Sequence, residues 1–530
     1  MSPSNAREDE YTIVPLTLLD ATLGNVNLYL RVSMIFDAQL SFEKLRSSWF
    51  DMIRARPVIG ALVRRSKSSP SALAYHIPTP ATLERYIDDQ FTVPDQHKDF
   101  FCMDESHRSI NDYCPAFGTG ARAPTRSTDG IFVADGAAPE DKARCTGFNG
   151  IASIQELLDS NRPIVTTQVT RFRDATVITC SMSHIFGDLF SFKAMFQGWE
   201  SALHGASPAP FEQLGVDPFR AYGPGGELGS QGGTEPVPPP GWRVYGWMDK
   251  ARFLRRFLWD VYVSRPERTI SSKHIFIPES HLRALEDRAK HDLVTVQAKR
   301  RRRGRAEQET PLRVSRSDVL YAWLLKNNHA HLAPDHWCSP ATIANARAKP
   351  PAPLRARSSD FPSHEWYGAA MCVGLGSLRA GDIMKMPLGE LALYVREAVK
   401  ENSSRENAKK WMAFQLHHNL WKKPSGRFVF WCPPHHHWSG LTDWRLGKLP
   451  DVDFTPARID GGGDDNRGPV TVCAIDGYMI SGSTQRNCWI CLGEADGGVW
   501  IIGITGQGEW THPQGLGRYR RLRHRPASKL

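Results

Sequence analysis

Residues 163–204 contain the sequence pattern that most restricts the possible folds of this chain. Two apolar runs, at residues 164–169 and 175–180, are separated by the polar sequence RFRD, which predicts two strands joined by a turn. After Asp188 the large apolar residues recur at helical spacing: Leu189, Phe192, Phe196, Trp199 and Leu203. Strands that lead directly into a helix indicate an α/β fold.

The N-terminal region shows the same alternation. An apolar run at residues 28–36 predicts a strand, and Ser41 is a typical helix N-cap. The apolar residues that follow it have helical spacing: Phe42, Leu45, Trp49, Met52 and Ile53. Pro57 and Gly60 end this predicted helix, and residues 61–65 predict another strand.

The junction between the second strand and its helix contains His184 and Asp188, in the spacing H-x-x-x-D. The same spacing occurs at His331 and Asp335, and short motifs of this kind arise by chance in a chain with 19 histidines. His331 ends a predicted helix that begins at Ser315, and loop residues follow it. We therefore interpret His331 as a helix terminus and His184 as the candidate for chemistry.

A neutral imidazole accepts a proton near physiological pH, which is what acyl transfer to an alcohol or amine requires of a general base. Such a reaction also needs donors for the oxyanion. No G-x-S-x-G motif of a serine nucleophile occurs in the sequence. Asp188 either orients the histidine, as in a triad, or braces the helix start with a basic partner from the other half of the chain; we favour the second. The alternative for His184 is a polar strand end without chemistry.

A chain of 530 residues predicts more than one domain. The Pro- and Gly-rich stretch at residues 205–245 is the best candidate for a linker, and a predicted strand at 271–278 with a helix from about Glu279 restarts the α/β pattern. The predicted organisation is an N-terminal half at 1–204, a crossover linker at 205–268 and a C-terminal half at 269–530.

The composition, with 23% charged and 41% hydrophobic residues, is that of a globular protein, and no apolar run has the length of a membrane span. The N-terminal sequence lacks an apolar signal core, which argues against secretion. Ten scattered cysteines fit a reducing compartment. The single C-x-x-C, Cys488 and Cys491, has no second pair nearby, so no metal site is expected.

The net charge of +10 is concentrated in KRRRRGR at residues 299–305 and in the last residues of the chain. The basic run is interpreted as a solvated loop, with contact to a phosphorylated cofactor and nucleic-acid binding as alternatives. The sequence ends in Ser528, Lys529 and Leu530, and a C-terminal S-K-L is an address for the peroxisome.

Several segments, in order along most of the chain, resemble one family, the BAHD-type coenzyme A-dependent acyltransferases, especially the fungal branch. The similar segments are PLTLLDATL, RARPVIGALVRR, SMSHIFGDLFSF, GVDPF, SRSDVLYAWLLK, NARAKPPAP with WYGAA, and LTDWRLGKLPDVDFTPARID. The resemblance implies an α/β fold of two similar chloramphenicol-acetyltransferase-like domains. Each would have a mixed sheet with flanking helices, and a tunnel would run along the domain interface.

By the same resemblance, His184 is the general base near the middle of the tunnel, and Asp188 is structural and pairs with Arg347 of NARAKP. Thr442 and Trp444 of LTDWR match positions proposed to stabilise the oxyanion. No acyl-enzyme is implied, and acyl-CoA is a co-substrate rather than a permanent cofactor.

Asp453 matches the aspartate of the family's D-F-G-W-G motif, a structural motif away from the tunnel. This sequence departs from the family pattern at Leu189, where a glycine is usual, at Ala369, where an asparagine is usual, and in DFTPA at residues 453–457. After about residue 492 the chain does not match the expected closing helix.

The predicted function is transfer of a short- or medium-chain acyl group from coenzyme A to a hydroxyl of a secondary metabolite, for example a sugar or polyol glycolipid such as a mannosylerythritol lipid. The alternatives are N-acylation in siderophore biosynthesis, a standalone condensation-type domain and a non-catalytic acyl-CoA-binding homologue. A hydroxyl or amine acceptor and the peroxisomal import receptor are the expected partners. We expect a peroxisomal monomer without nucleic acid or a membrane span.

Overall fold

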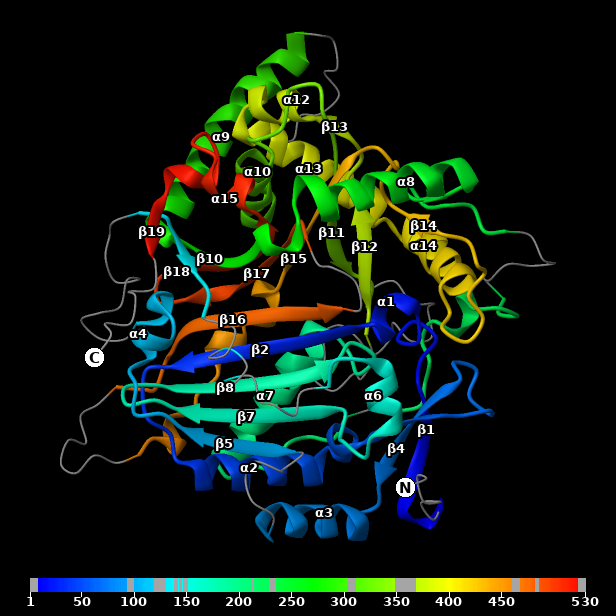
Figure 1. Ribbon diagram of the computed structural model, residues 1–530, viewed down its shortest axis with the longest axis vertical. Helices are drawn as coiled ribbons and strands as arrows, with labels where there is room; N and C mark the ends of the chain where they lie inside the picture. The colour runs from blue at the N-terminus through cyan, green and yellow to red at the C-terminus, as the bar shows by residue number, and fades with distance from the viewer. Residues whose placement is uncertain are drawn as a thin grey trace.

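A computed structural model of the chain describes residues 8–92, 100–118, 130–137, 142, 145, 151–211, 214–227, 235–302, 311–347, 368–459, 468–481 and 486–522. Two large mixed sheets, each with flanking helices, make up most of it (Figure 1). This architecture confirms the predicted α/β class with mixed sheets.

The first sheet lies in the lower half of Figure 1 and has five strands. Their order is β16 (Val472–Ser481), β2 (Leu28–Phe36), β8 (Thr176–Ser183), β7 (Val165–Arg171) and β5 (Phe101–Glu105). Two helices, α2 (Phe42–Ala55) and α7 (Leu189–Leu203), pack against each other through Trp49 and Trp199, whose ring centroids lie 4.7 Å apart. Trp199 also contacts Phe101 of β5, so both helices are anchored to this sheet.

The second sheet has nine strands and lies in the upper half. The main path is β12 (Ala370–Gly374), β11 (Trp337–Asn345), β15 (His437–Asp443), β17 (Cys488–Ala495), β18 (Gly498–Gly506), β10 (Ile270–Pro278), β6 (Phe132–Asp135) and β19 (Arg520–Leu522), with β13 (Leu378–Arg379) beside β11. The helices α9 (Glu279–Arg302), α10 (Arg316–Asn328) and α13 (Leu388–Asn402) accompany it.

Each sheet contains a strand from the opposite half of the sequence. β16 pairs with β2, and β6 pairs with β10, both antiparallel. The predicted domain boundaries at residues 204 and 269 stay a prediction, and strand pairing crosses them in both directions. The predicted linker includes β9 (Arg243–Val244), which pairs with β14 (Val429–Phe430), and α8 (Trp247–Trp259).

The remaining elements are smaller or peripheral. A three-stranded sheet has the order β1 (Tyr11–Pro15), β4 (Leu73–Pro78) and β3 (Leu62–Arg65). The other helices are α1 (Leu23–Val26), α3 (Pro80–Thr92), α4 (Ile110–Tyr113), α6 (Ile154–Asp159), α12 (Ala380–Lys385), α14 (Arg405–His418) and α15 (Gln507–Thr511). Among the helices in the described ranges, none is both long and apolar enough to cross a bilayer.

Local signals in the sequence set several boundaries. The predicted strand at 28–36 is β2, and the Ser41 side chain caps α2 by accepting a hydrogen bond from the Lys44 amide at 3.3 Å. Ser315 caps α10 in a capping box with Asp318. The loop predicted for the basic run is wrong at residues 299–302, which form the end of α9, while residues 303–305 lie outside the described part.

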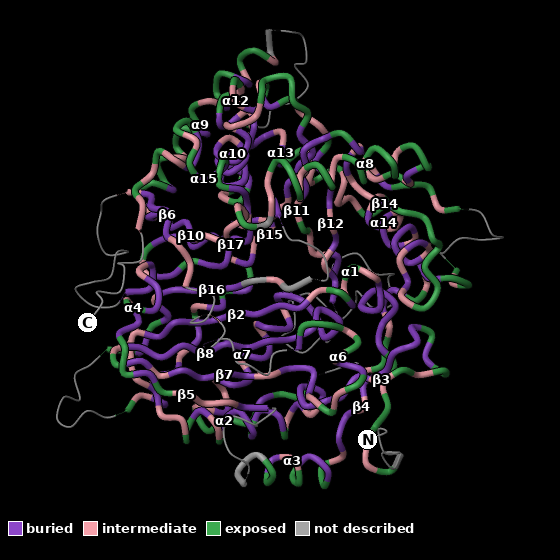
Figure 2. Tube along the Cα trace, viewed as in Figure 1, coloured by how far each residue is buried: buried purple, intermediate pink, exposed green. Residues whose placement is uncertain are grey.

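Two clusters of buried apolar side chains form the cores of the two sheets, as the purple segments of Figure 2 show. The first cluster holds the side chains between α2, α7 and the lower sheet and continues onto the upper sheet through Phe276, Ile490 and Trp500. The second cluster holds the side chains between α10, α13 and the upper sheet. The candidate motif at residues 181–192 includes the C-terminal end of β8, and its Asp188 accepts a hydrogen bond from Ala369, a buried residue of the second cluster.

Candidate active site

The segment between β8 and α7 is a tight turn that holds His184 and Asp188 in fixed places. The His184 amide donates to the Leu28 carbonyl at 2.8 Å, which ties the residue to the end of β2. Gly187 has φ of 151°, and a Cβ there would lie 1.9 Å from Ser191 Oγ. Only glycine fits this position, so Gly187 lets the chain turn before Asp188 caps α7.

Asp188 points away from a triad geometry and binds Arg347. Both carboxylate oxygens accept hydrogen bonds from the guanidinium, at 2.8 Å each. The amides of Phe190 and Ala369 donate to the same carboxylate at 2.9 and 3.0 Å. Burial raises the pKa of Asp188, but the Arg347 charge and these bonds outweigh it and hold the pKa below its usual value. The structure thus brings together the two residues that the family resemblance paired.

Two further carboxyl groups, of buried Asp20 and partly buried Asp217, connect the family-like segments. Asp20 accepts hydrogen bonds from the Thr17 hydroxyl at 2.6 Å and from the Gly368 amide at 3.1 Å. Asp217 accepts from the Leu18 and Phe219 amides at 2.8 and 2.9 Å. Burial raises the pKa of both carboxyls. The segment PLTLLDATL therefore contacts GVDPF through Leu18 and contacts Gly368, the neighbour of Ala369, through Asp20.

A cavity of about 270 Å³ lies between the ends of the two large sheets and includes His184 in its wall. Its lining is mainly apolar and comes from β2, β11, β15 and β17, with Leu30, Ile343, Leu441, Trp431 and Trp438 among the larger side chains. Thr442 and Trp444 line the same cavity, which places both oxyanion candidates and the candidate base around one space. Among the lining groups, His184 is the histidine available to that space.

His184 is buried and neutral. Burial lowers the pKa of its imidazole, and the Asp188 carboxylate opposes this without reversing it. No other described residue offers its Nδ1 atom a hydrogen-bond partner. A neutral imidazole in an apolar cavity can accept a proton from an acceptor hydroxyl.

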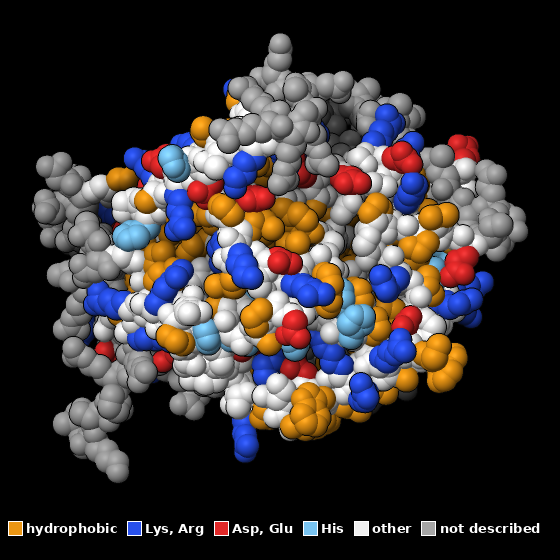
Figure 3. Space-filling view, turned by 90° about the horizontal axis from the view of Figure 1, so that it is seen from above, with side chains coloured by type: hydrophobic (Ala, Val, Ile, Leu, Met, Phe, Trp, Pro, Cys, Tyr) orange, Lys and Arg blue, Asp and Glu red, His pale blue; other side chains and the backbone are white. Residues whose placement is uncertain are grey.

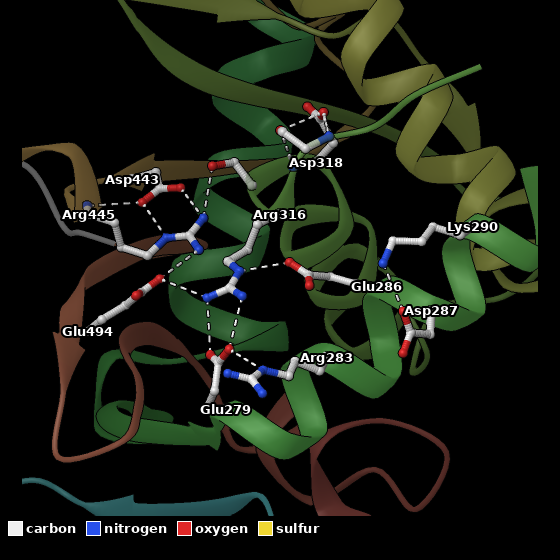
Figure 4. A network of polar contacts seen from close by, with 12 residues as sticks. Glu279, Arg283, Glu286, Asp287, Lys290, Arg316, Asp318, Asp443, Arg445 and Glu494 are labelled. Carbon is white, nitrogen blue, oxygen red and sulfur yellow. Dashed lines mark hydrogen bonds and ion pairs between the residues drawn. The ribbon is translucent and has the colours of Figure 1, made fainter. Parts of the chain in front are cut away.

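The strand end that carries Thr442 and Trp444 is held by a network of charges, shown in Figure 4. Arg445 donates to Asp443 at 2.7 and 3.0 Å and to the Ser317 hydroxyl at 2.8 Å. Glu494 lies 3.5 Å from both Arg445 and Arg316, and Arg316 in turn binds Glu279 and Glu286 of α9. Because these ties fix β15 to α9 and α10, Thr442 and Trp444 keep their position in the cavity wall. The Trp444 amide also donates to the Cys491 carbonyl at 2.7 Å.

A second cavity, of about 560 Å³, adjoins the first. The two share wall residues that include Thr342 of β11, Leu441 of β15 and Leu446 in the turn after β15. The second cavity is the more polar one, with Ser317 at the N-terminal end of α10 in its wall. Its charged residues are paired with one another: Arg445 binds Asp443 at 2.7 Å, and Lys448 lies 3.7 Å from Asp451.

The departures from the family pattern have local explanations. The Leu189 side chain packs against Gly447, because a Cβ added to Gly447 would lie only 2.6 Å from Leu189 Cδ1. The glycine that this turn needs is Gly187, two residues before Leu189. At Ala369 the backbone amide supplies the bond to Asp188. Beyond residue 492 the chain continues as the β17–β18 hairpin.

Asp453 lies outside the lining of the cavity and against the C-terminal end of α7. Its amide donates to Glu200 at 2.8 Å, and its carboxylate accepts from the Thr455 amide at 2.9 Å and lies 3.3 Å from His204. Thr455–Ala457 form a single helical turn whose last carbonyl accepts from the Ser41 amide at 2.7 Å. DFTPA thus makes a turn that connects α7 to the start of α2.

Of the other predicted features, the second H-x-x-x-D spacing lies away from this site, whereas Cys488 lines the first cavity. His331 lies past the end of α10 and its Nδ1 pairs with the Asn328 carbonyl at 2.9 Å, as expected of a helix terminus. Cys488 and Cys491 lie on β17, and the described ranges contain no group of three potential metal ligands. The peroxisomal residues Ser528, Lys529 and Leu530 lie outside the described residues.

The sequence did not predict most of the residues that line the first cavity. Trp431 and Trp438 come from a segment in which no motif was identified, and Leu28 and Leu30 read only as strand residues. Asp20 and Asp217 lie in quoted motifs but received no role. The sequence did contain one indication of a structural role, because each aspartate is the single charged residue in an otherwise uncharged segment, LLDAT or GVDPF.

Known proteins resemble this chain over nearly its full length. Acetyltransferase MATC1 of Mycosarcoma maydis is 35% identical over 531 residues, covering 96% of this chain and 98% of that protein. Acetyltransferase MAT1 of Pseudozyma antarctica (strain T-34) is 34% identical over 523 residues, covering 97% and 98%. No family model matches the chain.

Solved structures share the fold at low sequence identity. TRI101 of F. graminearum, complexed with coenzyme A and T-2 mycotoxin, has a TM-score of 0.55 at 12% identity and covers 94% of this chain and 96% of its own. Vinorine synthase has a TM-score of 0.52 at 11% identity and covers 98% and 95%. These likenesses concern the arrangement of the two sheets and their helices.

Proposed function

Because the chain belongs to the BAHD-type fungal acetyltransferases that include MATC1 and MAT1, we propose that it transfers an acyl group from coenzyme A to an acceptor hydroxyl with His184 as general base. The observation that carries this proposal is the shared cavity. The neutral imidazole of His184 and the oxyanion candidates Thr442 and Trp444 line one largely apolar space between the sheets.

The proposed reaction needs no acyl-enzyme. His184 accepts the proton of the acceptor hydroxyl as the oxygen attacks the thioester carbonyl. The resulting oxyanion is stabilised by donors at Thr442 and Trp444. When the tetrahedral intermediate collapses, the carbon–sulfur bond breaks and the departing thiolate of coenzyme A takes the proton back from the imidazolium. The products are the ester and free coenzyme A.

We propose that coenzyme A occupies the second cavity. Its uncharged pantetheine arm would lie along this wall, where Arg445 and Lys448 are already paired with Asp443 and Asp451. The thioester would then reach the first cavity past the shared wall at Thr342 and Leu446. This route leaves the Trp431 and Trp438 side of the first cavity to the acceptor.

We further propose an amphiphilic acceptor, such as a sugar or polyol glycolipid of the mannosylerythritol lipid type, and a short- or medium-chain acyl group. The large aromatic and aliphatic side chains of the first cavity support an acceptor with an apolar part. Its small volume supports a compact acyl group.

The test is mass spectrometry of reactions that contain the purified protein, a series of acyl-CoAs and candidate acceptors bearing hydroxyl, amine or hydroxylamine groups. We expect the ester of a glycolipid and stoichiometric free coenzyme A. His184→Ala should lower turnover roughly a hundredfold to ten-thousandfold. The matched control is His331→Ala, in the second H-x-x-x-D spacing, which should retain wild-type turnover. Equal losses in both variants would refute the role of His184.

The peroxisomal location expected from Ser528, Lys529 and Leu530 stays a prediction. Its test is a fluorescent fusion at the N-terminus, with and without the last three residues. Removal should move the fluorescence from peroxisomes to the cytosol, and an unchanged distribution would dismiss the prediction.

A further inference from the structure

The helix α8 leaves an unusual amount of apolar surface uncovered. In the residues that the structure describes, none of the side chains of α8 is buried. Trp247 is 78% exposed, Leu254 54% and Leu258 43%. Exposed apolar patches of this kind mark interaction sites.

These three side chains form one stripe along the helix. Positions 247, 254 and 258 differ by seven and four residues, which places them on one line at 3.6 residues per turn. Ala251, also exposed, fills the gap in the stripe. Beyond the helix the π-helical turn Asp260–Ser264 adds exposed Tyr262 and Val263, beside exposed Trp259.

The opposite face of α8 is occupied by the protein. The Phe253 ring lies 5.1 Å from the Phe428 ring and 5.5 Å from the Phe430 ring, so this face packs on β14. The helix is thereby held with its apolar stripe outward. Figure 1 shows α8 at the outer edge of the upper half, and Figure 3 shows hydrophobic side chains standing among Lys and Arg side chains on that face.

The charges beside the stripe are almost all positive. Between Arg243 and Trp259 the chain has five basic residues and one acidic residue, Asp249. Lys250, Arg252 and Arg255 are exposed around the stripe, and Asp249 pairs with Arg252 at 4.0 Å. The partner of this surface must therefore offer an apolar layer bordered by negative charge.

We propose that α8 and the following turn dock on an anionic phospholipid membrane, with the helix lying in the plane of the interface. An interfacial helix has Trp and Leu on its apolar face and Lys and Arg on its polar flanks, and anionic lipids attract the basic residues. Trp and Tyr favour the headgroup level, which suits Trp247, Trp259 and Tyr262. An interface between two copies of the chain fits less well, because a symmetric contact would bring two positively charged surfaces face to face.

Docking at α8 would bring the cavity wall close to the lipid. Phe253 contacts Phe430, and the Phe430 ring lies 4.0 Å from the ring of Trp431, which lines the first cavity. A continuous aromatic path thus leads from the docking helix to the space beside His184. The docking itself is independent of the proposed acyl transfer.

The test is co-sedimentation of the full-length protein with vesicles of phosphatidylcholine, or of equal parts phosphatidylcholine and phosphatidylserine. We expect the wild type to bind the anionic vesicles and to lose affinity in high salt. The variant Trp247→Ser/Leu254→Ser/Leu258→Ser should bind about tenfold or more weakly, because it removes the apolar anchor. The matched control Ile13→Ser/Val216→Ser/Val294→Ser changes exposed apolar residues elsewhere and should bind like the wild type.

A second variant tests the charges separately. Lys250→Gln/Arg252→Gln/Arg255→Gln should keep weak binding to neutral vesicles but lose the preference for phosphatidylserine. Binding that is equal in wild type and in the Trp247 triple variant would overturn the proposal. So would a dimer, seen by light scattering, that dissociates in that variant while neither protein binds vesicles. Neither measurement depends on acyl-transfer activity.

Discussion

His184 and Asp188 lie four residues apart, yet their surroundings leave the first neutral and the second ionised. Burial in an apolar cavity keeps the imidazole neutral, whereas two guanidinium hydrogen bonds keep the carboxylate ionised. The Asp188 carboxylate therefore forms a salt bridge with Arg347 and does not orient the histidine. The proposed chemistry rests on the imidazole, and the carboxylate secures the turn that presents it.

The pH dependence of the rate is the first prediction at this scale. The pKa of His184 lies below the usual 6.5, so the imidazole is neutral throughout the neutral range. We expect kcat/KM to be constant above pH 7 and to fall only below the ordinary range of histidine, as the base becomes protonated. Measured pH–rate profiles should show this limb in the wild type and lack it in His184→Ala. An inflection above pH 7 would contradict the prediction.

The pair of Asp188 and Arg347 gives a second prediction. Asp188→Asn leaves the buried guanidinium without its counter-charge and should lower the free energy of unfolding by about 3–5 kcal/mol. The matched control is Asp453→Asn, at a half-exposed carboxylate, which should cost less than about 1 kcal/mol. Urea unfolding followed by circular dichroism measures both variants. A stable Asp188→Asn protein with slowed turnover would instead indicate a direct role in chemistry.

At the scale of elements, the turn between β8 and α7 depends on one glycine. Gly187→Ala would place a Cβ against Ser191 in a left-handed backbone conformation, and both effects destabilise the turn. Gly205 also has positive φ, 76°, but has open space around it. We expect Gly187→Ala to lower the free energy of unfolding by about 2 kcal/mol more than Gly205→Ala. Equal losses in thermal or urea unfolding would show that the turn tolerates a side chain.

Elements with local signals could be predicted from the sequence. The apolar run of β2, the cap at Ser41 and the helical spacing of α7 all appear within one short window. The positions of β6 and β16 could not, because each pairs with a strand more than a hundred residues away. The same limit hid Trp431 and Trp438, which reach the cavity only once β11 and β15 are in place. Arg347 was found through the resemblance, since no local pattern joins it to Asp188.

At the scale of the whole molecule, a buried polar contact links the two sheets. Asp476 of β16 belongs to the lower sheet and His274 of β10 to the upper one, and the His274 Nε2 lies 2.9 Å from Asp476 Oδ1. Lys142 lies 3.9 Å from the other carboxylate oxygen. The two sheets meet at this contact as well as at the cavity. The contact therefore helps to fix the distance between the sheets, and with it the positions of His184 and Thr442 in the cavity wall.

The final prediction concerns the stability of this contact as a function of pH. Burial raises the pKa of Asp476, but Lys142 and His274 outweigh it and bring the pKa to about 2, below its ordinary value of 3.8. The ionised carboxylate therefore contributes stability that is fully present above pH 3.8 and is lost as the pH falls toward 2. This shift corresponds to about 2 kcal/mol. Asp476→Asn should thus unfold at lower urea concentration than the wild type at pH 7, and the difference should shrink as the pH falls from 3.8 toward 2. The exposed pair of Lys410 and Glu406 provides the control, because Glu406→Gln should leave the urea midpoint nearly unchanged at every pH. A difference between Asp476→Asn and wild type that stays constant on acidification would mean that the carboxylate charge does not hold the two sheets together.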